Sequence, residues 1–252
     1  MIALTLRRFD DLLRGDATQL PNLTNGRFDL PAGAMSILLT ILGMVYGVCM
    51  GLFSITPNGS GHAMQILAAT VKVPALFLLT TVVTFPSLYV FNTLFGSKLR
   101  FLPTLRLIVG TLTVTLAVLS SIGPIVGFFS VSSTSYAFVV LMNVAVFAVS
   151  GALGLSFLLK TLTRIQEANR PLPPPLPEGV SPSVAAAMNR PSNGWMVLMI
   201  WILLFGVVGA QMGWVLRPFI GSPGQEFTWF RPISGNFFEA VTTQLQRLGV
   251  GR

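Results

Sequence analysis

The sequence has few charged residues, and this shortage excludes a cytosolic globular enzyme. Only 10% of its 252 residues are charged, against about 25% in an ordinary soluble domain. Sixteen are basic and eight are acidic, so the formal net charge is +8. The basic residues are scattered singly or in pairs and form no stripe of the kind that binds nucleic acid. We therefore expect no nucleic-acid partner.

Cysteine and histidine are almost missing. The one cysteine, Cys49, excludes an internal disulfide framework and a cysteine-based zinc site. The one histidine, His62, could bind the metal of a haem or chlorophyll, although an ordinary loop histidine is the stronger interpretation. The motifs HExxH and GxSxG and paired intramembrane aspartates are also missing. The sequence thus predicts no catalytic residue, metal site or cofactor, and it leaves a bound lipid or pigment open.

Apolar sequence is abundant instead. Hydrophobic residues make up 52% of the chain. Five stretches without any charged residue or histidine are long enough to cross a bilayer core, which takes about 20 helical residues. These stretches are residues 35–55, 73–94, 107–129, 136–159 and 195–216. Because an open sheet edge cannot face lipid, we expect an all-α membrane protein with five transmembrane helices in residues 35–216.

The segments between these stretches differ in their basic residues. Four arginines lie in the N-terminal segment 1–34 and four Lys or Arg residues in the fourth loop, 160–194, whereas the first loop, 56–72, holds only Lys72 at its far edge. The positive-inside rule then places the N-terminus in the cytoplasm and the C-terminal tail 217–252 outside. The N-terminal segment contains four aspartates, so we expect no cleavable signal peptide.

An amphipathic helix is predicted near the N-terminus, at residues 2–14. Ile2, Leu6, Phe9 and Leu13 share one helical face. Such a helix can lie on the cytoplasmic membrane surface, dock on a partner, or cover the protein's own cytoplasmic face.

The fourth loop contains the proline-rich run PLPPPLPEGVSP at residues 171–182. Consecutive prolines favour the stiff, extended polyproline II conformation. We prefer a spacer between two helices over a docking site for a proline-binding domain.

The tail is rich in aromatic residues and carries a second amphipathic pattern. Asn236 followed by Glu239 is typical of a capping box that begins a helix, and apolar residues then share one face as far as Gly249. Aromatic residues at this density seldom face water, so we expect the helix to press on the outer membrane surface or on another subunit. The candidate partner contacts are Phe227, Trp229, Phe230, Phe237 and Phe238.

Two predicted spans carry stripes of small residues. Gly43, Gly47 and Gly51 recur every four residues in the first span, a pattern that lets two helix backbones approach closely. The last span carries Gly206 with Ala210 and Gly209 with Gly213. The first span could therefore pack against the last one or against another protein.

Two prolines, Pro86 and Pro124, lie inside the second and third predicted spans and should kink them. Kinked helices gate some transporters, but no span contains a carboxylate for proton or sodium coupling, so active transport is not expected. A passive channel or small-molecule transporter stays an alternative. It would need a continuous polar path past Thr80, Thr84, Asn143 and Gln211.

Two segments of the second span are similar to known proteins. The sequences KVPALFLLT at 72–80 and FPSLYVFNTLFG at 85–96 resemble a group of bacterial polytopic membrane proteins of unassigned function. The five-span layout over residues 35–216, with a cytoplasmic N-terminal region, is similar to that of the Yip1-like membrane proteins. The GPW-type signature of the eukaryotic members is missing. The resemblance implies a membrane-organising role and no catalytic residues.

The leading hypothesis is a non-catalytic integral membrane subunit that stabilises or helps assemble a larger complex. The glycine stripes, the amphipathic ends and the missing coupling and catalytic residues favour it. Its expected partners are other integral membrane proteins and the lipid bilayer, and respiratory or photosynthetic complexes are natural hosts. The passive channel and a Yip1-like membrane-organising protein are the two alternatives.

Overall fold

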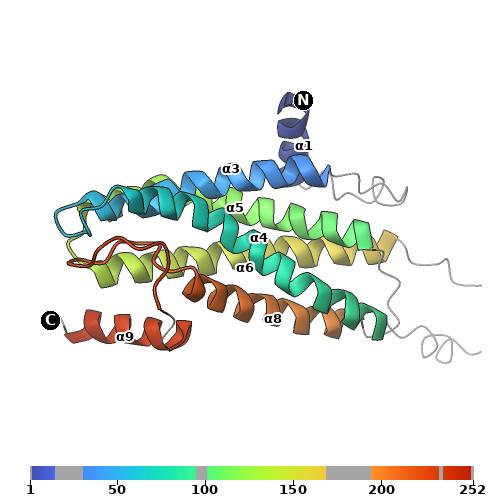
Figure 1. Ribbon diagram of the computed structural model, residues 1–252. Helices are drawn as coiled ribbons and strands as arrows, with labels where there is room; N and C mark the ends of the chain where they lie inside the picture. The colour runs from blue at the N-terminus through green and yellow to red at the C-terminus, as the bar shows by residue number, and fades with distance from the viewer. Residues whose placement is uncertain (1, 15–30, 95–100, 169–193, 233–234, 251–252) are drawn as a thin grey trace, which may run out of the picture.

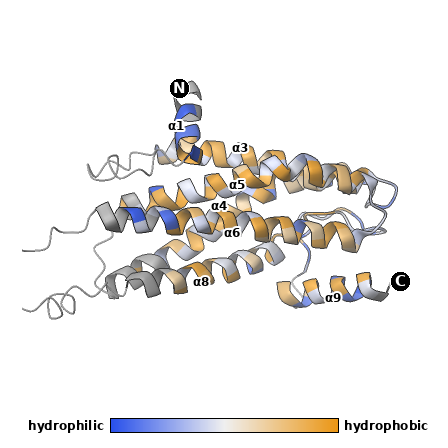
Figure 2. Cartoon of the chain, turned by 180° about the vertical axis from the view of Figure 1, so that it is seen from behind, coloured by the Kyte–Doolittle hydropathy of each residue, from blue (hydrophilic) through white to orange (hydrophobic). Residues whose placement is uncertain are grey.

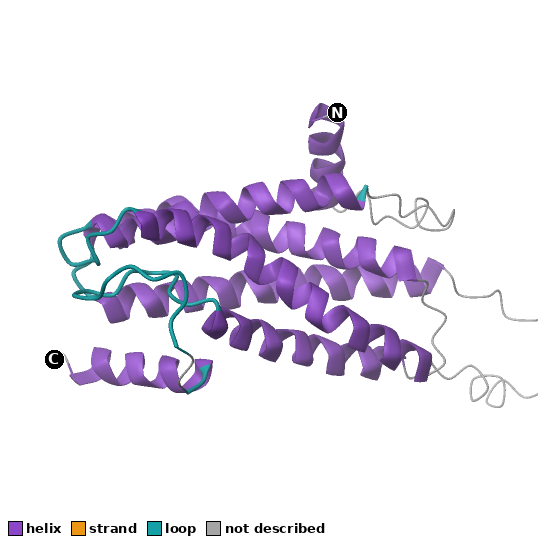
Figure 3. Ribbon diagram, viewed as in Figure 1, coloured by secondary structure: helices purple, strands orange, loops and turns teal. Residues whose placement is uncertain are grey.

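The structure, a computed structural model, describes residues 2–14, 31–94, 101–168, 194–232 and 235–250. Every regular element in these ranges is a helix (Figure 3). The elements are α1 (Ile2–Arg14), α3 (Ala32–Gly51), the 3-10 turn η2 (Leu52–Ile55), α4 (Met64–Leu94), α5 (Phe101–Ser132), α6 (Tyr136–Ala168), α8 (Gly194–Val215) and α9 (Phe237–Val250). Helices α3, α4, α5, α6 and α8 run roughly side by side, and α9 lies beyond the end of α8 (Figure 1). The all-α prediction is confirmed.

Four of these helices are long and apolar enough to cross a membrane. The candidate spans are Ala32–Ile55, Met64–Ser87, Thr104–Ser132 and Tyr136–Thr161. A fifth apolar helix, Met199–Val215, is shorter. Hydrophobic residues predominate along the coloured parts of the bundle helices, whereas the coloured part of α1 carries many hydrophilic residues (Figure 2). These helices are those of an integral membrane protein.

Helix α5 is central to the bundle and packs against both α3 and α6. Tyr46 of α3 is fully buried, and its hydroxyl donates a 2.8 Å hydrogen bond to Oδ1 of Asn143 in α6. The amide nitrogen of Asn143 donates to the carbonyl of Val139, one turn earlier in the same helix. Because both polar side chains have partners, they can be buried among apolar groups at little cost. The pair ties α3 to α6.

Helix α8 packs against α4 but covers only part of it. Nε1 of Trp201 donates a 3.0 Å hydrogen bond to the carbonyl of Thr84. Near the other end of α8, a Cβ atom at Gly213 would lie 3.9 Å from the side chain of Leu76. Leu76 is at the middle of the candidate span Met64–Ser87. The chain that follows α8 therefore covers the first half of this span.

The two amphipathic helices dock on the bundle. Leu12 of α1 is fully buried in a cluster with Met35 of α3 and Val109 of α5. Helix α9 begins after Asn236, whose Oδ1 accepts a 2.9 Å hydrogen bond from the backbone N–H of Glu239, as expected of an N-cap. Helix α9 packs against both α6 and α8.

Helix α4 begins earlier than the sequence predicted. It starts at Met64, nine residues before the predicted start of the second span, so the connection after η2 comprises residues 56–63. The prediction excluded Lys72 from the helix because a charged group is costly in a membrane. Lys72 instead belongs to α4, and its side chain is buried with hydrogen-bond partners for its ammonium group.

Candidate functional site

The segment between α8 and α9, residues 216–232, is held against α4 by a buried lysine. Nζ of Lys72 donates to the carbonyl of Pro218 at 2.9 Å and to the carbonyl of Trp229. It also lies 5.1 Å from the centre of the Phe230 ring. The Lys72 side chain is only 3% exposed. An ammonium group can be buried to this extent because carbonyl oxygens and an aromatic face replace its water.

Gln65 holds the same segment from two turns earlier in α4. Its Nε2 donates to the carbonyls of Pro218 and Phe219, at 2.9 and 3.0 Å. Residues seven apart share a helix face, so Gln65 and Lys72 both point at the segment. An irregular segment has carbonyls without helical partners, and their burial costs free energy unless donors are supplied. These two side chains supply the donors, and we name the contact the tail clamp.

Two arginines of the segment itself contact other parts of the segment and the end of α8. Nη2 of Arg217 donates to the carbonyl of Pro232 at 2.6 Å, and its guanidinium lies 3.6 Å from the centre of the Trp214 ring. Nη1 of Arg231 donates to Oγ of Ser222 at 3.2 Å. Burial and then the like charge of Arg231 lower the pKa of Arg217. The backbone N–H of Arg231 donates to the carbonyl of Arg217 at 3.4 Å, so the two arginines lie side by side.

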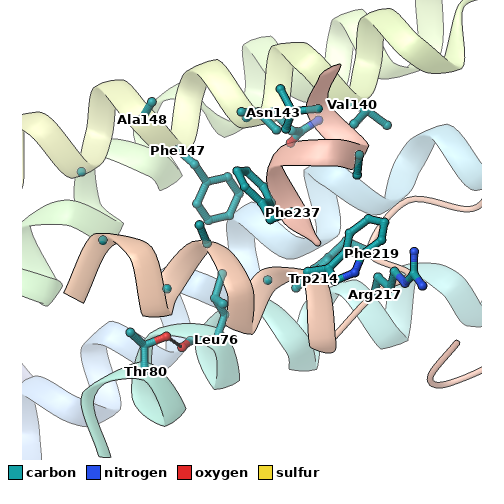
Figure 4. Close-up of a pocket in the computed structure, with 18 of the residues that line it drawn as sticks. Leu76, Thr80, Val140, Asn143, Phe147, Ala148, Trp214, Arg217, Phe219 and Phe237 are labelled. Atoms are coloured by element: carbon teal, nitrogen blue, oxygen red, sulfur yellow. Dashed lines mark hydrogen bonds between the residues drawn. The ribbon is translucent and has the colours of Figure 1, made fainter. Parts of the chain in front are cut away.

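A cavity of about 880 Å³ lies between α6 and α8, and we name it the α6–α8 cavity. On α6 its lining runs from Tyr136 to Leu158. The tail segment and α9 border one end of it. In Figure 4, Arg217 lies at the Val140 end of the cavity, away from Ala148.

The polar groups along the inner wall of the α6–α8 cavity are bonded within the bundle. The hydroxyls of Thr80, Thr111 and Thr115 donate to carbonyls four residues earlier, at 2.7, 2.9 and 3.0 Å. Asn143 is paired with Tyr46. These groups have little remaining capacity to bind a polar ligand, so this wall suits an apolar one.

The predicted polar path of a channel is not assembled at this cavity. Thr80 and Asn143 line it, but Thr84 and Gln211 do not. The hydroxyl of Thr84 donates to the carbonyl of Thr80 at 2.7 Å.

The glycine stripe of α3 packs against α4. A Cβ atom added at Gly43, Gly47 or Gly51 would lie 2.6 to 3.0 Å from atoms of α4. At Gly47 the nearest atoms belong to the backbone of Ala69 and Thr70. The two helices therefore meet backbone to backbone, and the stripe does not face the last span.

The small residues of α8 are not equivalent. Cβ atoms at Gly209 and Gly213 would lie 3.5 and 3.9 Å from side chains of α4, an ordinary contact distance. A Cβ atom at Gly206 would have no neighbour within 4 Å, and Gly206 lines the α6–α8 cavity together with Ala210. Gly206 therefore faces the α6–α8 cavity and not another helix of this chain, and its predicted packing role stays a prediction.

The aromatic residues proposed as partner contacts divide into two groups. Phe230, Phe238 and Trp229 are exposed by 60%, 53% and 42%. Phe227 and Phe237 are half-buried, and Phe237 lines the α6–α8 cavity (Figure 4).

The remaining candidate residues predicted from the sequence belong neither to the tail clamp nor to the α6–α8 cavity. Pro86 and Pro124 lie inside continuous helices, and His62 is exposed in the loop before α4. In the part of the chain that the structure describes, no group of three or more His, Cys, Asp or Glu residues could hold a metal ion. The proline-rich run 171–182 lies outside the described residues.

Sequence reasoning missed the tail clamp, although one signal for it was present. Lys72 has apolar residues on both sides, and a cation in such a stretch indicates a buried partner. The partners are backbone carbonyls, which no side-chain pattern reveals.

No family model, no curated protein and no solved structure matches the chain. The resemblance to the Yip1-like membrane proteins therefore stays a prediction.

Proposed function

We propose that this chain is a non-catalytic integral membrane subunit that packs against other integral membrane proteins and so stabilises or helps assemble a larger complex. The observation that supports this proposal is the tail clamp. Lys72 and Gln65 hold the tail segment in place, while its aromatic residues Trp229 and Phe230 stay exposed. A surface already held in its binding shape loses little conformational entropy when a partner binds.

The proposed topology has five spans: α3, α4, α5, α6 and α8. The arginine-rich N-terminal segment and the connection between the α6 and α8 spans are cytoplasmic in this topology, and the tail clamp and α9 lie on the outer side. The short fifth span fits the proposal, because the tail segment covers the half of the α4 span that α8 leaves uncovered. A bacterial cytoplasmic membrane is the proposed location, with respiratory or photosynthetic complexes as natural hosts.

The channel alternative has less support. The threonine hydroxyls of the cavity wall donate hydrogen bonds within their own helices. Of the residues on the predicted polar path, only Thr80 and Asn143 line the cavity. The Yip1-like alternative rests on the resemblance alone. Both stay predictions.

A photocrosslinking experiment with matched positions tests the proposal. Phe230 in the tail segment and Phe128 in α5 are aromatic and similarly exposed, by 60% and 65%. A photoreactive phenylalanine at position 230 should crosslink in native membranes to one defined membrane protein. The same group at position 128, which faces lipid in the proposed topology, should give lipid adducts. Lipid adducts at both positions, together with a monomer in mild detergent, would contradict the proposal.

A further inference from the structure

The α6–α8 cavity plays no part in the proposed partner contact, and its dimensions indicate what can fill it. Its lining from Tyr136 to Leu158 corresponds to about 33 Å of helix, at about 1.5 Å per residue. A space of this length, about 880 Å³ in volume and lined mainly by apolar side chains, has the elongated form of an acyl chain.

The position of the cavity makes the bilayer the source of its ligand. Its lining on α6 runs along the candidate span Tyr136–Thr161. Gly151 of α6 and Gly206 of α8 line it, and a Cβ atom at either would have no neighbour within 4 Å. The space between these two helices is therefore open at membrane depth, beside a wall whose hydroxyls are already bonded. An apolar chain gains by burial there, and a water-soluble ligand has few groups to bind.

Positive charge gathers in the lining contributed by the tail and α9. Arg217, Arg231 and Arg247 line the cavity, and Glu239 is the one carboxylate among its lining residues. Burial and the neighbouring Arg231 lower the pKa of Arg217, so a nearby anion would relieve the repulsion between the two guanidinium groups. Gln244 also lines the cavity, and its buried Oε1 has no hydrogen-bond partner among the described residues. A side-chain amide in this position can turn its N–H groups toward an anion.

We infer that the α6–α8 cavity binds one anionic phospholipid from the surrounding membrane. One of its acyl chains lies between α6 and α8, and its phosphate lies at Arg217 and Arg231 of the tail segment. Arginine binds phosphate through paired, charge-assisted hydrogen bonds, and basic sites between transmembrane helices hold anionic headgroups. A zwitterionic phospholipid offers the same chain, but its cationic group opposes the arginines.

Native mass spectrometry of the delipidated full chain in mild detergent tests this inference. The protein is offered phosphatidylglycerol and phosphatidylcholine with identical acyl chains, in equal amounts. We expect at least about tenfold more phosphatidylglycerol to be retained, because charge-assisted hydrogen bonds strengthen its binding. Inorganic phosphate in a third sample should neither bind nor displace the lipid. Displacement by phosphate alone would show a free-anion site and overturn the inference.

Two kinds of variant separate the headgroup from the chain. Arg231→Gln, in the tail segment, should reduce the preference for phosphatidylglycerol toward parity. Lys160→Gln, an exposed cation in α6 outside the cavity lining, should leave the preference unchanged.

Gly151→Phe should obstruct the cavity between α6 and α8 and abolish retention of both lipids, because its Cβ has open space around it. Gly33→Phe, also in open space but outside the cavity lining, is the matched control. If Gly151→Phe does not fold, Gly206→Leu fills the same space from the α8 side. Equal retention of the two lipids by the wild type overturns the inference. So does undiminished phosphatidylglycerol binding by a cavity-filled variant with wild-type thermal stability.

Discussion

Glycines line two neighbouring regions of this bundle, and the regions differ in what occupies the space that the glycines leave. Between α3 and α4, a Cβ atom at Gly47 would lie 2.6 Å from the carbonyl oxygen of Ala69, so backbone fills the space. Between α6 and α8, Gly151 and Gly206 have no such neighbour within 4 Å, and a cavity of about 880 Å³ remains. The same residue type thus forms a seam in one region and an opening in the other.

The difference lies in the residues on the opposing helices. Helix α4 presents Ile66, Ala69 and Pro74 to the α3 glycines, and the missing glycine side chains allow the two backbones to meet. The α6–α8 cavity is lined by large rings instead. Phe147 of α6 stacks on Phe77 of α4, and Trp201 and Phe205 of α8 contact each other. These rings separate the helices, so a glycine between them adds to the cavity.

The largest expected effect comes from filling the seam. Gly47→Leu would force a side chain into the backbone of α4, and overpacking of this kind costs about 1–3 kcal/mol or more. We expect a large fall in the thermal midpoint measured in detergent, with loss of the α3–α4 contact. Gly206→Leu, the same change at the opening, should leave the midpoint nearly unchanged. Similar losses in both variants would show that the seam and the opening do not differ in packing.

A smaller effect is expected from breaking the tail clamp, which borders the opening. Lys72→Met removes the donor to the carbonyls of Pro218 and Trp229, and each unsatisfied buried group costs about 1–3 kcal/mol. Part of this cost is offset because the lysine no longer has to be buried. Gln65 still holds Pro218, so the bundle should stay folded while the tail segment loosens.

Cysteine labelling measures that loosening. With Cys49 replaced by serine, a cysteine at the exposed Thr228 should react several times faster in Lys72→Met than in the parent. Lys160→Met, which removes an exposed cation, is the control. An unchanged labelling rate in Lys72→Met would mean that the clamp does not hold the segment.

Much of the helical architecture was predictable, because long apolar stretches dictate helices in a membrane whatever they pack against. The N-cap at Asn236 was predictable for a similar reason, since it depends on residues three apart. The start of α4 was not, because the free energy of burying Lys72 depends on carbonyls far along the chain. The helix that packs against the α3 glycines could not be predicted, and neither could the α6–α8 cavity. A glycine in a sequence shows that a side chain is missing, but not which atoms occupy that space.

The smallest expected effect concerns the wall between the seam and the opening, where Tyr46 of α3 bonds Asn143 of α6. Interhelical hydrogen bonds in membrane proteins contribute about 0.6 kcal/mol on average, which sets the expected coupling between the two residues. A double-mutant cycle of Tyr46→Phe and Asn143→Leu measures it, with unfolding free energy as the readout. Asn143→Leu should also leave any flux in liposomes unchanged, because the amide serves packing. A coupling above about 2 kcal/mol would exceed the known range of such bonds. Helix α6 would then be held firmly to α3 beside the α3–α4 seam. The opening between α6 and α8 would in that case be a rigid part of the bundle.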